Sequence, residues 1–173
     1  MDSIINLFLH FGKDLLPIFI VYEYENAIKL SGGKYTNRIY SAGWYWKIPI
    51  YDEILTVTTI LTTLSIPVQS LVTVDNKSIT VKGVVKYKID SADAFLLEIY
   101  DATDAISDTT QGIIAKECTK RTWEDIRNED IDNEITKKLR LAVKKWGVYI
   151  ENVTLSDKTE STVLRIFNEN END

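Results

Sequence analysis

The first residues of the chain carry hydrophobic side chains at helical spacing. Between Ser3 and Leu16 the apolar positions fall on one broad arc, and the polar and charged positions fall on the other. Ser3 can cap a helix, and Pro17 lacks the amide that a continuing helix would use. We therefore predict an amphipathic helix within residues 1–17. Its exposed apolar stripe consists of Ile4, Ile5, Leu7, Phe8, Phe11, Leu15 and Leu16.

From Ile18 the pattern changes to β-branched and aromatic residues with short turns between them, which is typical of strands. The pattern predicts strands over residues 18–22 and 34–36, on either side of a glycine turn. Residues 54–66 are dense in Thr, Val, Ile and Leu, and prolines stand near both borders. This segment is predicted to form one long strand or two short ones.

Residues 79–89 alternate between two faces. The odd positions from Ile79 to Ile89 are mostly apolar, whereas the even positions carry Thr, Lys and Val. Side chains alternate across a strand, so only one face of this segment is expected to be dry. With Asp75-Asn76 at a tight turn, the pattern predicts a hairpin.

The second half of the chain is mainly helical in pattern. We predict helices over 92–100, 103–119 and 130–146, a strand over 148–155, and a short helix over 158–167 followed by an acidic tail. Gly147 is expected to end the third helix. Because strands precede helices and one strand returns after them, the sequence indicates an α+β fold. The third helix has a predicted buried stripe of Ile131, Ile135, Leu139, Ala142, Val143 and Trp146.

Charge and composition exclude several partners. The net charge is −6 over 173 residues, which opposes nucleic acid as a ligand because phosphates require basic surfaces. No stretch reaches the roughly 18 apolar residues of a spanning helix, and the chain start lacks the basic residues of a secretory signal. We expect neither a transmembrane helix nor export. Cys118 is interpreted as a small buried residue.

Candidate catalytic and metal-binding residues are few. The single histidine, His10, lies on the polar side of the predicted N-terminal helix, so hydrolytic triads and most zinc sites are not expected. Asp101, Asp104 and Asp108 share a helix face and could bind a divalent cation, but acidic residues near a helix start also favour its dipole. We favour that capping role. The residues therefore predict no catalytic group, no cofactor and no metal.

Four segments in the same order resemble motifs of one family. Residues 42–52 are similar to its Pro-Gly-x-x-x-x-x-Pro-x-x-Asp turn, with Ala42 in place of proline, and 72–76 resemble its Thr-x-Asp hairpin tip. Residues 84–89 resemble the following strand, and 146–153 its Trp-Gly-Ile-x-Val-x-x-Val signature. The family is the SPFH family of stomatin, prohibitin and flotillin, also called band 7. The matched residues, all with structural explanations, are Gly43, Pro49, Asp52, Thr73, Asp75, Trp146 and Gly147.

The resemblance implies a curved, mostly antiparallel sheet flanked by helices over residues 18–157, after a separate helix at 1–17 and before a helix and tail at 158–173. It also implies a non-enzymatic, membrane-associated scaffold that forms homo-oligomers, organises membrane proteins or lipids, and lies peripherally on the cytoplasmic side of a membrane. The alternative is a soluble oligomeric structural or regulatory subunit, such as a modulator of a membrane protease.

Assembly in this family depends largely on a coiled coil after the domain, and members usually carry a membrane segment before it. We expect neither in this sequence, so oligomers would rest on lateral contacts between the domains themselves.

Two apolar features have more than one interpretation. Trp44, Tyr45 and Trp46 could stack on a base or lie at a membrane interface, but we favour packing in the core and at its rim. The N-terminal stripe could enter a lipid interface or pack on protein, and we favour lipid. Lys13 is the one basic residue of that segment, so binding to lipid would be mainly hydrophobic.

Overall fold

The computed structural model describes residues 16–128 and 130–160. The chain divides into two compact units: residues 1–62, 87–105 and 142–149 form the first unit, and residues 63–86, 106–141 and 150–173 form the second. The division falls inside five elements, which therefore contribute to both units. These are β6 (Thr62–Ser65), β8 (Ser78–Ile89), α3 (Ala102–Cys118), α5 (Ile131–Val143) and β9 (Val148–Glu160).

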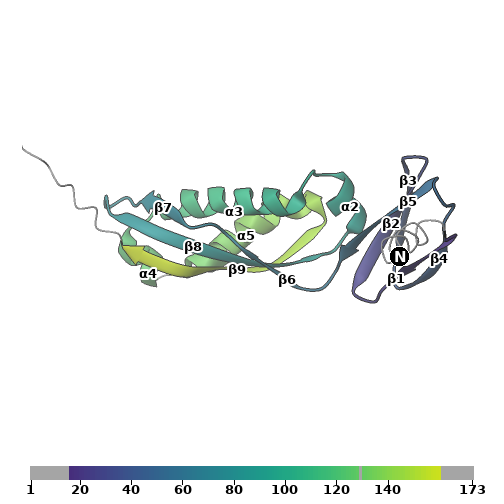
Figure 1. The fold of residues 1–173 in the computed structure, drawn as a ribbon. Helices are drawn as coiled ribbons and strands as arrows, with labels where there is room; N and C mark the ends of the chain where they lie inside the picture. Colours follow the sequence, from purple (N-terminus) through teal and green to yellow (C-terminus); the bar gives the residue numbers. More distant parts are fainter. Residues whose placement is uncertain (1–15, 129, 161–173) are drawn as a thin grey trace, which may run out of the picture. The chain divides into compact units, whose positions relative to one another are not determined.

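The first unit contains two small antiparallel sheets (Figure 1). In one sheet β2 (Glu25–Ser31) lies between β3 (Lys34–Tyr40) and β5 (Asp52–Thr58). In the other sheet β1 (Ile18–Val21) pairs with β4 (Gly43–Trp46). The short helix α2 (Ala92–Leu97) also belongs to this unit.

Two groups of buried side chains hold the first unit together. The first group joins β1 to β5, and half of its members are aromatic. The second joins β2, β3 and β5 to α2 and the end of β8. The first consists of Val21, Ala27 and Tyr40 with Phe19, Tyr45 and Ile54, and the second of Ile28, Val57 and Ala92 with Tyr35, Leu55, Ile89, Phe95 and Leu96. Removing this apolar surface from water stabilises the unit.

The second unit is built around β8, which pairs with β6 (Thr62–Ser65), β7 (Gln69–Val72) and β9 (Figure 1). The odd positions Ile79, Val81 and Val85 of β8 are fully buried, whereas the even positions are partly or fully exposed. The predicted dry face of this strand is therefore confirmed. Helices α3, α4 (Trp123–Asn128) and α5 supply further buried side chains to this unit.

Side chains of α5 form hydrogen bonds with backbone groups along one edge of β9. Thr136 Oγ1 accepts the amide of Val153 at 2.9 Å, and Asp132 Oδ1 accepts the amide of Leu155 at 3.3 Å. Arg140 Nε donates to the carbonyl of Ile150 at 2.7 Å. An edge strand with open backbone groups invites pairing with other chains, so these bonds protect this edge while fixing the helix to the sheet.

A chain of charged side chains joins α3 to α5. Glu117 is 3% exposed and accepts from Lys138 at 2.7 Å, while Lys138 also reaches Glu134 at 2.8 Å. Arg121 pairs with Glu134 from the other side. The two glutamates raise the pKa of Lys138, and Lys138 lowers the pKa of Glu134.

The α+β fold predicted from the sequence is confirmed, with corrections to individual elements. Residues 54–66 contain two strands, and β2 and α4 were not predicted. The helix predicted from Lys158 is wrong at its start, because β9 continues to Glu160. There Glu160 Oε2 lies 3.7 Å from Nζ of Lys77, the residue directly before β8. The remainder of that segment lies outside the described residues.

The predicted helix over 130–146 and its buried stripe also need correction. α5 ends at Val143 and is followed by a 3-10 turn, η1 (Lys144–Trp146). A 3-10 turn has about three residues per turn, so the stripe loses its register at this point. Trp146 is consequently only half-buried. Ala142, which lies inside α5, is exposed, while the four other stripe residues are buried. α2 likewise ends at Leu97 rather than Tyr100.

Candidate functional site

The strand pair β1–β4 is apolar on both faces. Its register places Phe19 opposite Tyr45, and both rings point inward, with centroids 5.5 Å apart. Tyr45 also packs edge-on against Tyr40, at 4.9 Å between centroids. Since side chains alternate along a strand, the neighbours of Phe19 and Tyr45 must point outward.

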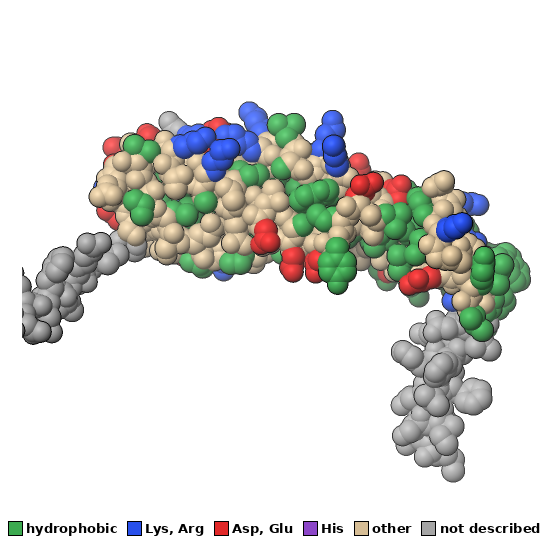
Figure 2. Space-filling view, turned by 90° about the horizontal axis from the view of Figure 1, so that it is seen from above, with side chains coloured by type: hydrophobic (Ala, Val, Ile, Leu, Met, Phe, Trp, Pro, Cys, Tyr) green, Lys and Arg blue, Asp and Glu red, His purple; other side chains and the backbone are tan. Residues whose placement is uncertain are grey.

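The outward face carries large hydrophobic side chains instead of polar ones. Trp44 and Trp46 are 67% and 66% exposed, and Ile20, opposite Trp44, is 58% exposed. Figure 2 shows a group of hydrophobic side chains on the first unit, close to where the described chain begins. We call this surface the apolar ribbon. It consists of Leu16, Ile18, Ile20, Trp44, Trp46, Ile48 and Ile50.

Ile50 is the most exposed member of the ribbon, at 96%. Its φ of 70° lies in the left-handed region, where a β-branched side chain is a genuine outlier. Such a conformation costs on the order of 1–3 kcal/mol and persists only where surrounding contacts impose it. A strained hydrophobic residue that points into solvent indicates selection for something other than stability.

Asp52 supplies the contacts that hold this turn. Its carboxylate, 1% exposed, accepts the amide of Ile48 at 2.9 Å and the hydroxyl of Ser31 at 2.6 Å, and it lies 3.3 Å from Lys29 Nζ. The bond from the Ile48 amide, followed by the one from Ser31, holds the pKa of Asp52 below its usual range. The turn from β4 to β5 is thus fixed from inside while its apolar side chains point outward.

Pro49 and Asp52 of the first motif lie at this turn, whereas Gly43 begins β4. Gly43 has a φ of 150°, and a Cβ there would approach the Tyr45 hydroxyl to 3.2 Å. Pro49 is half-buried between Ile48 and Ile50. These residues shape the ribbon.

Thr73 and Asp75 lie at the turn between β7 and β8, in the second unit. Thr73 Oγ1 donates to Asp75 Oδ1, which also accepts the amide of Trp123 at 3.2 Å. The Val74 amide donates to the carbonyl of Arg121 at 3.1 Å. The hairpin tip is therefore bound to the connection between α3 and α4.

Trp146 and Gly147 close η1 in the first unit. Gly147 has a φ of 67°, and its carbonyl accepts the amides of Asp90 and Ser91 at 2.8 and 3.0 Å. A Cβ at Gly147 would lie 2.4 Å from the Ser91 carbonyl oxygen, so only glycine fits. This residue joins η1 to the start of α2.

The predicted membrane-interface residues lie mostly outside the described chain. Ile4, Ile5, Leu7, Phe8, Phe11 and Leu15 fall there, while Leu16 is described and is 51% exposed. The structure therefore places one residue of that stripe, directly before β1 and within the ribbon.

The interpretation of the aromatic cluster as core and rim holds for Tyr45 and is wrong for Trp44 and Trp46. The sequence did contain a signal for the ribbon. Residues 18–21 and 43–46 are both apolar at successive positions, and two such short strands cannot both bury two faces in a small unit.

Reactive groups are sparse in the described part of the chain. Residues 16–128 and 130–160 hold no group of three or more His, Cys, Asp or Glu side chains placed to bind a metal. Cys118 is fully buried, and burial raises its pKa to about 11. Asp101 Oδ1 accepts the amide of Asp104 at 3.2 Å, as expected of a residue that caps α3. Within the same residues, no helix is both long and apolar enough to span a bilayer.

Comparison with known proteins identifies the family of this chain. The model of the SPFH domain / Band 7 family matches residues 19–172. Stomatin-1 of Caenorhabditis elegans is 25% identical over 158 residues, which cover 90% of this chain and 48% of that protein. Stomatin of Mus musculus is 27% identical over 143 residues, or 81% of this chain and 50% of that protein.

An uncharacterized protein of Methanocaldococcus jannaschii is 26% identical over 142 residues, or 81% of this chain and 71% of that protein. The chain spans about half the length of the stomatins that it matches. Since the family match extends over most of the sequence, the chain belongs to the SPFH domain / Band 7 family.

Proposed function

We propose that this chain is a non-enzymatic scaffold subunit that lies on the cytoplasmic side of a membrane, with its apolar ribbon in the interfacial region of one leaflet. The exposure of Trp44 and Trp46 on a paired, rigid strand is the observation that carries this proposal. Tryptophan is enriched at membrane–water interfaces because its ring is apolar and its N–H is polar.

The energy available from the ribbon is sufficient for binding. Complete burial of one large apolar side chain is worth about 1.5–3 kcal/mol, so half-burial of Ile20, Trp44 and Trp46 amounts to several kcal/mol. Lys47 is the one charged residue between Gly43 and Ile50, and residues 16–22 carry no charge. Binding would therefore depend little on salt or on anionic lipid.

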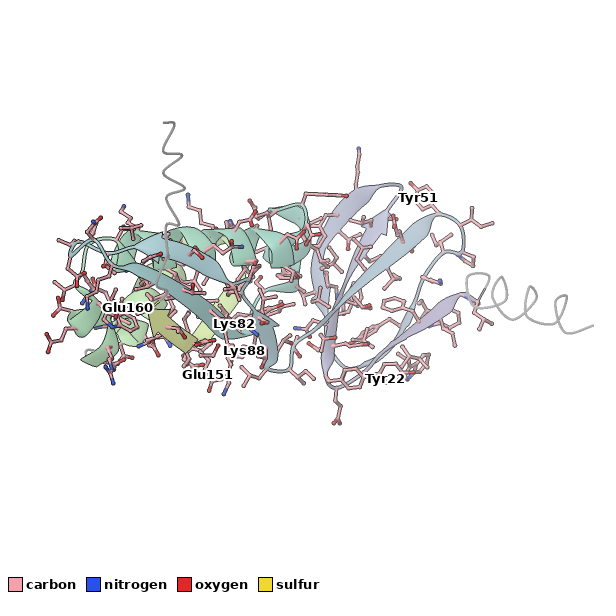
Figure 3. The ribbon with its side chains drawn as sticks, turned by 60° about the vertical axis from the view of Figure 1, so that its left-hand side comes forward. Tyr22, Tyr51, Lys82, Lys88, Glu151 and Glu160 are labelled. Carbon is pink, nitrogen blue, oxygen red and sulfur yellow. The ribbon has the colours of Figure 1, made fainter. Side chains whose placement is uncertain are left out.

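Two further tyrosines of the first unit are exposed, and Tyr22 lines a hollow together with Ile18, Ile20 and Trp44 of the ribbon. Tyr22 and Tyr51 are 55% and 58% exposed, and Figure 3 shows them at opposite ends of the strands of the first unit. Tyrosine shares the interfacial preference of tryptophan. The N-terminal stripe from Ile4 to Leu15 would add a second contact with lipid immediately before Leu16, as the sequence predicts.

The scaffold part of the proposal includes assembly into homo-oligomers that gather membrane proteins or lipids. Membership of a family that includes stomatins supports this role. The described geometry also favours a binding role over a catalytic one, because the turns of the first two motifs use Asp52 and Asp75 to hold backbone amides.

Liposome flotation of the full chain tests the proposal. We compare the wild type with the double variant Trp44→Ser/Trp46→Ser, and with Val68→Ser/Val74→Ser as a matched control, since these valines are 60% and 64% exposed. The tryptophan variant should bind neutral vesicles at least about tenfold more weakly, as 1.4 kcal/mol is a factor of ten. The control should bind like the wild type. Equal binding by all three proteins would contradict a lipid contact of the ribbon.

The alternative function is a soluble oligomeric regulatory subunit, for example of a membrane protease. The shortage of basic residues around the ribbon favours it, because Lys47 alone offers attraction to anionic headgroups. In that case another protein would cover Trp44 and Trp46. Light scattering that shows a defined assembly with no response to vesicles would support this alternative.

A further inference from the structure

Charges are segregated along part of the chain. From Asp90 to Ala115 the acidic residues are accompanied by no lysine, arginine or histidine, and from Ile135 to Ile150 the basic residues are accompanied by no acid. The acidic residues are Asp90, Asp93, Glu98, Asp101, Asp104 and Asp108, and the basic residues are Lys137, Lys138, Arg140, Lys144 and Lys145.

The acidic segment forms a surface at the connection between α2 and α3, in the first unit. Glu98, Asp101 and Asp104 are all exposed there, and Tyr100 is 99% exposed. An aromatic side chain with almost no contact to its own chain is unusual, and tyrosine is enriched at protein interfaces. We call Glu98, Tyr100, Asp101 and Asp104 the acidic surface.

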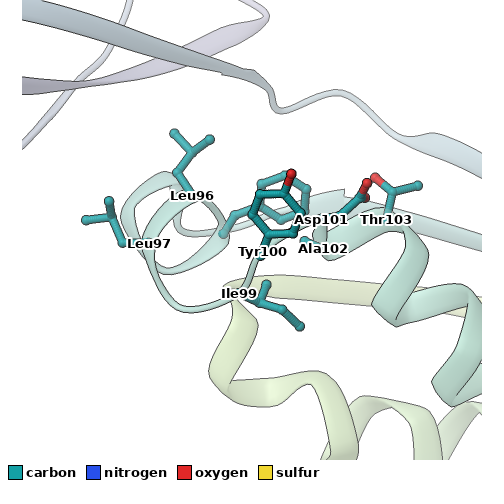
Figure 4. Close-up of a pocket in the computed structure, with 8 residues that line it drawn as sticks. Leu96, Leu97, Ile99, Tyr100, Asp101, Ala102 and Thr103 are labelled. Carbon is teal, nitrogen blue, oxygen red and sulfur yellow. The ribbon is translucent and has the colours of Figure 1, made fainter.

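A shallow pocket of about 430 Å³ lies beside Tyr100. Its lining includes apolar Leu96, Leu97 and Ile99, and on its other side Asp101 and Thr103. Figure 4 shows Tyr100 next to Asp101, with Leu96 and Leu97 on the last turn of α2. The pocket therefore offers an apolar wall, an aromatic ring and a carboxylate to one incoming side chain.

A lysine side chain has the matching chemistry. Its four-carbon stem can lie along apolar side chains while the ammonium remains at a polar rim. The ammonium could then face Asp101 and the Tyr100 ring, and a cation over an aromatic ring adds roughly 0.5–1 kcal/mol at an exposed site.

Lysines of this kind are present on η1, also in the first unit. Lys144 and Lys145 are adjacent and exposed. Among the described residues of the first unit, the only ion pair is formed by Lys29 and Asp52, so the acidic surface is not neutralised by these lysines within the unit. We call Lys144 and Lys145 the basic surface.

We propose that the acidic surface of one copy binds the basic surface of a second copy, head to tail, with a lysine of η1 in the pocket beside Tyr100. The contact joins two different surfaces, so each copy retains one free surface and the assembly grows into a ring or a filament. This inference rests on the proposed function, because it supplies the lateral contact that a scaffold requires.

The contact should be sensitive to salt, unlike binding of the ribbon to lipid. Exposed charges are screened over about 8 Å at physiological ionic strength and over about 3 Å at 1 M salt. Raising the salt concentration from 50 mM to 1 M should weaken self-association at least about tenfold, while flotation with neutral vesicles should change little.

Charge exchange tests the contact directly in sedimentation velocity runs on the full chain. Asp101→Lys/Asp104→Lys should make both surfaces basic, and Lys144→Glu/Lys145→Glu should make both acidic, so each variant alone should associate at least about tenfold more weakly. An equimolar mixture should recover association, because each variant then meets the complementary charge. Lys116→Glu/Lys120→Glu, two exposed lysines of the second unit, is the control and should associate like the wild type.

The outcomes separate this inference from the proposed function. If each variant keeps the wild-type association, or if the mixture fails to recover it, the proposed contact is wrong. Membrane binding, and assembly through another surface, would be unaffected by that result. A wild type that remains monomeric, with vesicles and without them, would overturn both the contact and the assembly part of the proposed function. Far-UV circular dichroism checks that each variant is folded.

Discussion

The turns from β4 to β5 and from β7 to β8 are both held by the hydrogen bonds of an aspartate, but the amides that these aspartates bind lie in different places. In each, an aspartate accepts one hydroxyl and one backbone amide: Ser31 and Ile48 for Asp52, Thr73 and Trp123 for Asp75. The amide held by Asp75 belongs to the helical layer, so that tip is bound down. The amide held by Asp52 belongs to its own turn, so that turn is stiffened while Ile50 points into solvent.

The difference shows how a scaffold can display hydrophobic residues without collapsing on itself. A free loop carrying Ile48 and Ile50 would fold back on the nearest apolar surface, since burial of such side chains is favourable. Fixing the backbone by a buried carboxylate prevents that. The second turn also carries an exposed valine, Val74 at 64%, but its contacts with Trp123 and Arg121 fix the tip to the connection between α3 and α4.

Removing the carboxylate of Asp52 should have the largest effect. Asp52→Ala leaves Lys29 without its partner and the Ile48 amide without its acceptor, so we expect the free energy of unfolding to fall by about 2–4 kcal/mol. Vesicle binding should weaken as well, because the turn that presents Ile50 is released. Urea unfolding and flotation measure the two effects. A variant with wild-type stability would contradict the proposed role of this carboxylate.

Thr73→Val is the corresponding change at the turn from β7 to β8. Thr73 is 4% exposed and its hydroxyl bonds both Asp75 and the Lys77 amide, so its loss should lower the free energy of unfolding by about 1–2 kcal/mol. Flotation should be unchanged, because this tip carries none of the ribbon residues. A loss of vesicle binding at unchanged stability would show that the two turns are not separated in function.

Acid should weaken both turns together. Hydrogen bonds lower the pKa of Asp52 and of Asp75, so the stabilisation is present above the usual aspartate pKa of about 3.9 and is lost as the pH falls through the lowered folded-state values. Asp52→Asn should flatten the fall in stability below about pH 4. Thermal unfolding between pH 2 and pH 6 measures this fall in stability. Parallel curves for wild type and variant would contradict the role given to the Asp52 carboxylate.

The smallest effect is expected at Ile50, and it should have the opposite sign. Ile50→Gly removes the strain of a left-handed β-branched residue and should raise the free energy of unfolding by up to about 1 kcal/mol, after the entropy cost of glycine. Vesicle binding should fall slightly because one exposed side chain is gone. Lower stability in this variant would mean that the Ile50 side chain is not strained.

Sequence patterns predicted the elements whose two faces differ. The alternation from Ile79 to Val85 and the spacing of Ile131, Ile135 and Leu139 each mark a single buried face, and both are confirmed. The four family motifs also led to the correct family. In these segments local pattern and tertiary burial agree, which is why the sequence is sufficient.

The pattern was insufficient where both faces are apolar or where tertiary contacts decide. Trp44-Tyr45-Trp46 alternates between core and surface, but the sequence does not show which face is covered, since Phe19 and Tyr40 determine it. The conformation of Ile50 depends on Asp52 and Ser31, twenty-one residues apart in sequence. The extension of β9 to Glu160 depends on pairing with β8, although Lys158 and Glu160 are common in helices.

Tryptophan fluorescence tests the central claim, that the apolar ribbon meets lipid, most directly. The full chain should show a blue shift on addition of neutral vesicles, and lipids brominated near the headgroup should quench the emission. Trp44→Phe/Trp46→Phe, which keeps Trp123 and Trp146, should lose both responses. A contact between the ribbon and lipid would be contradicted if the double variant retained the full shift and quenching. It would also be contradicted if the wild type floated with vesicles without either response.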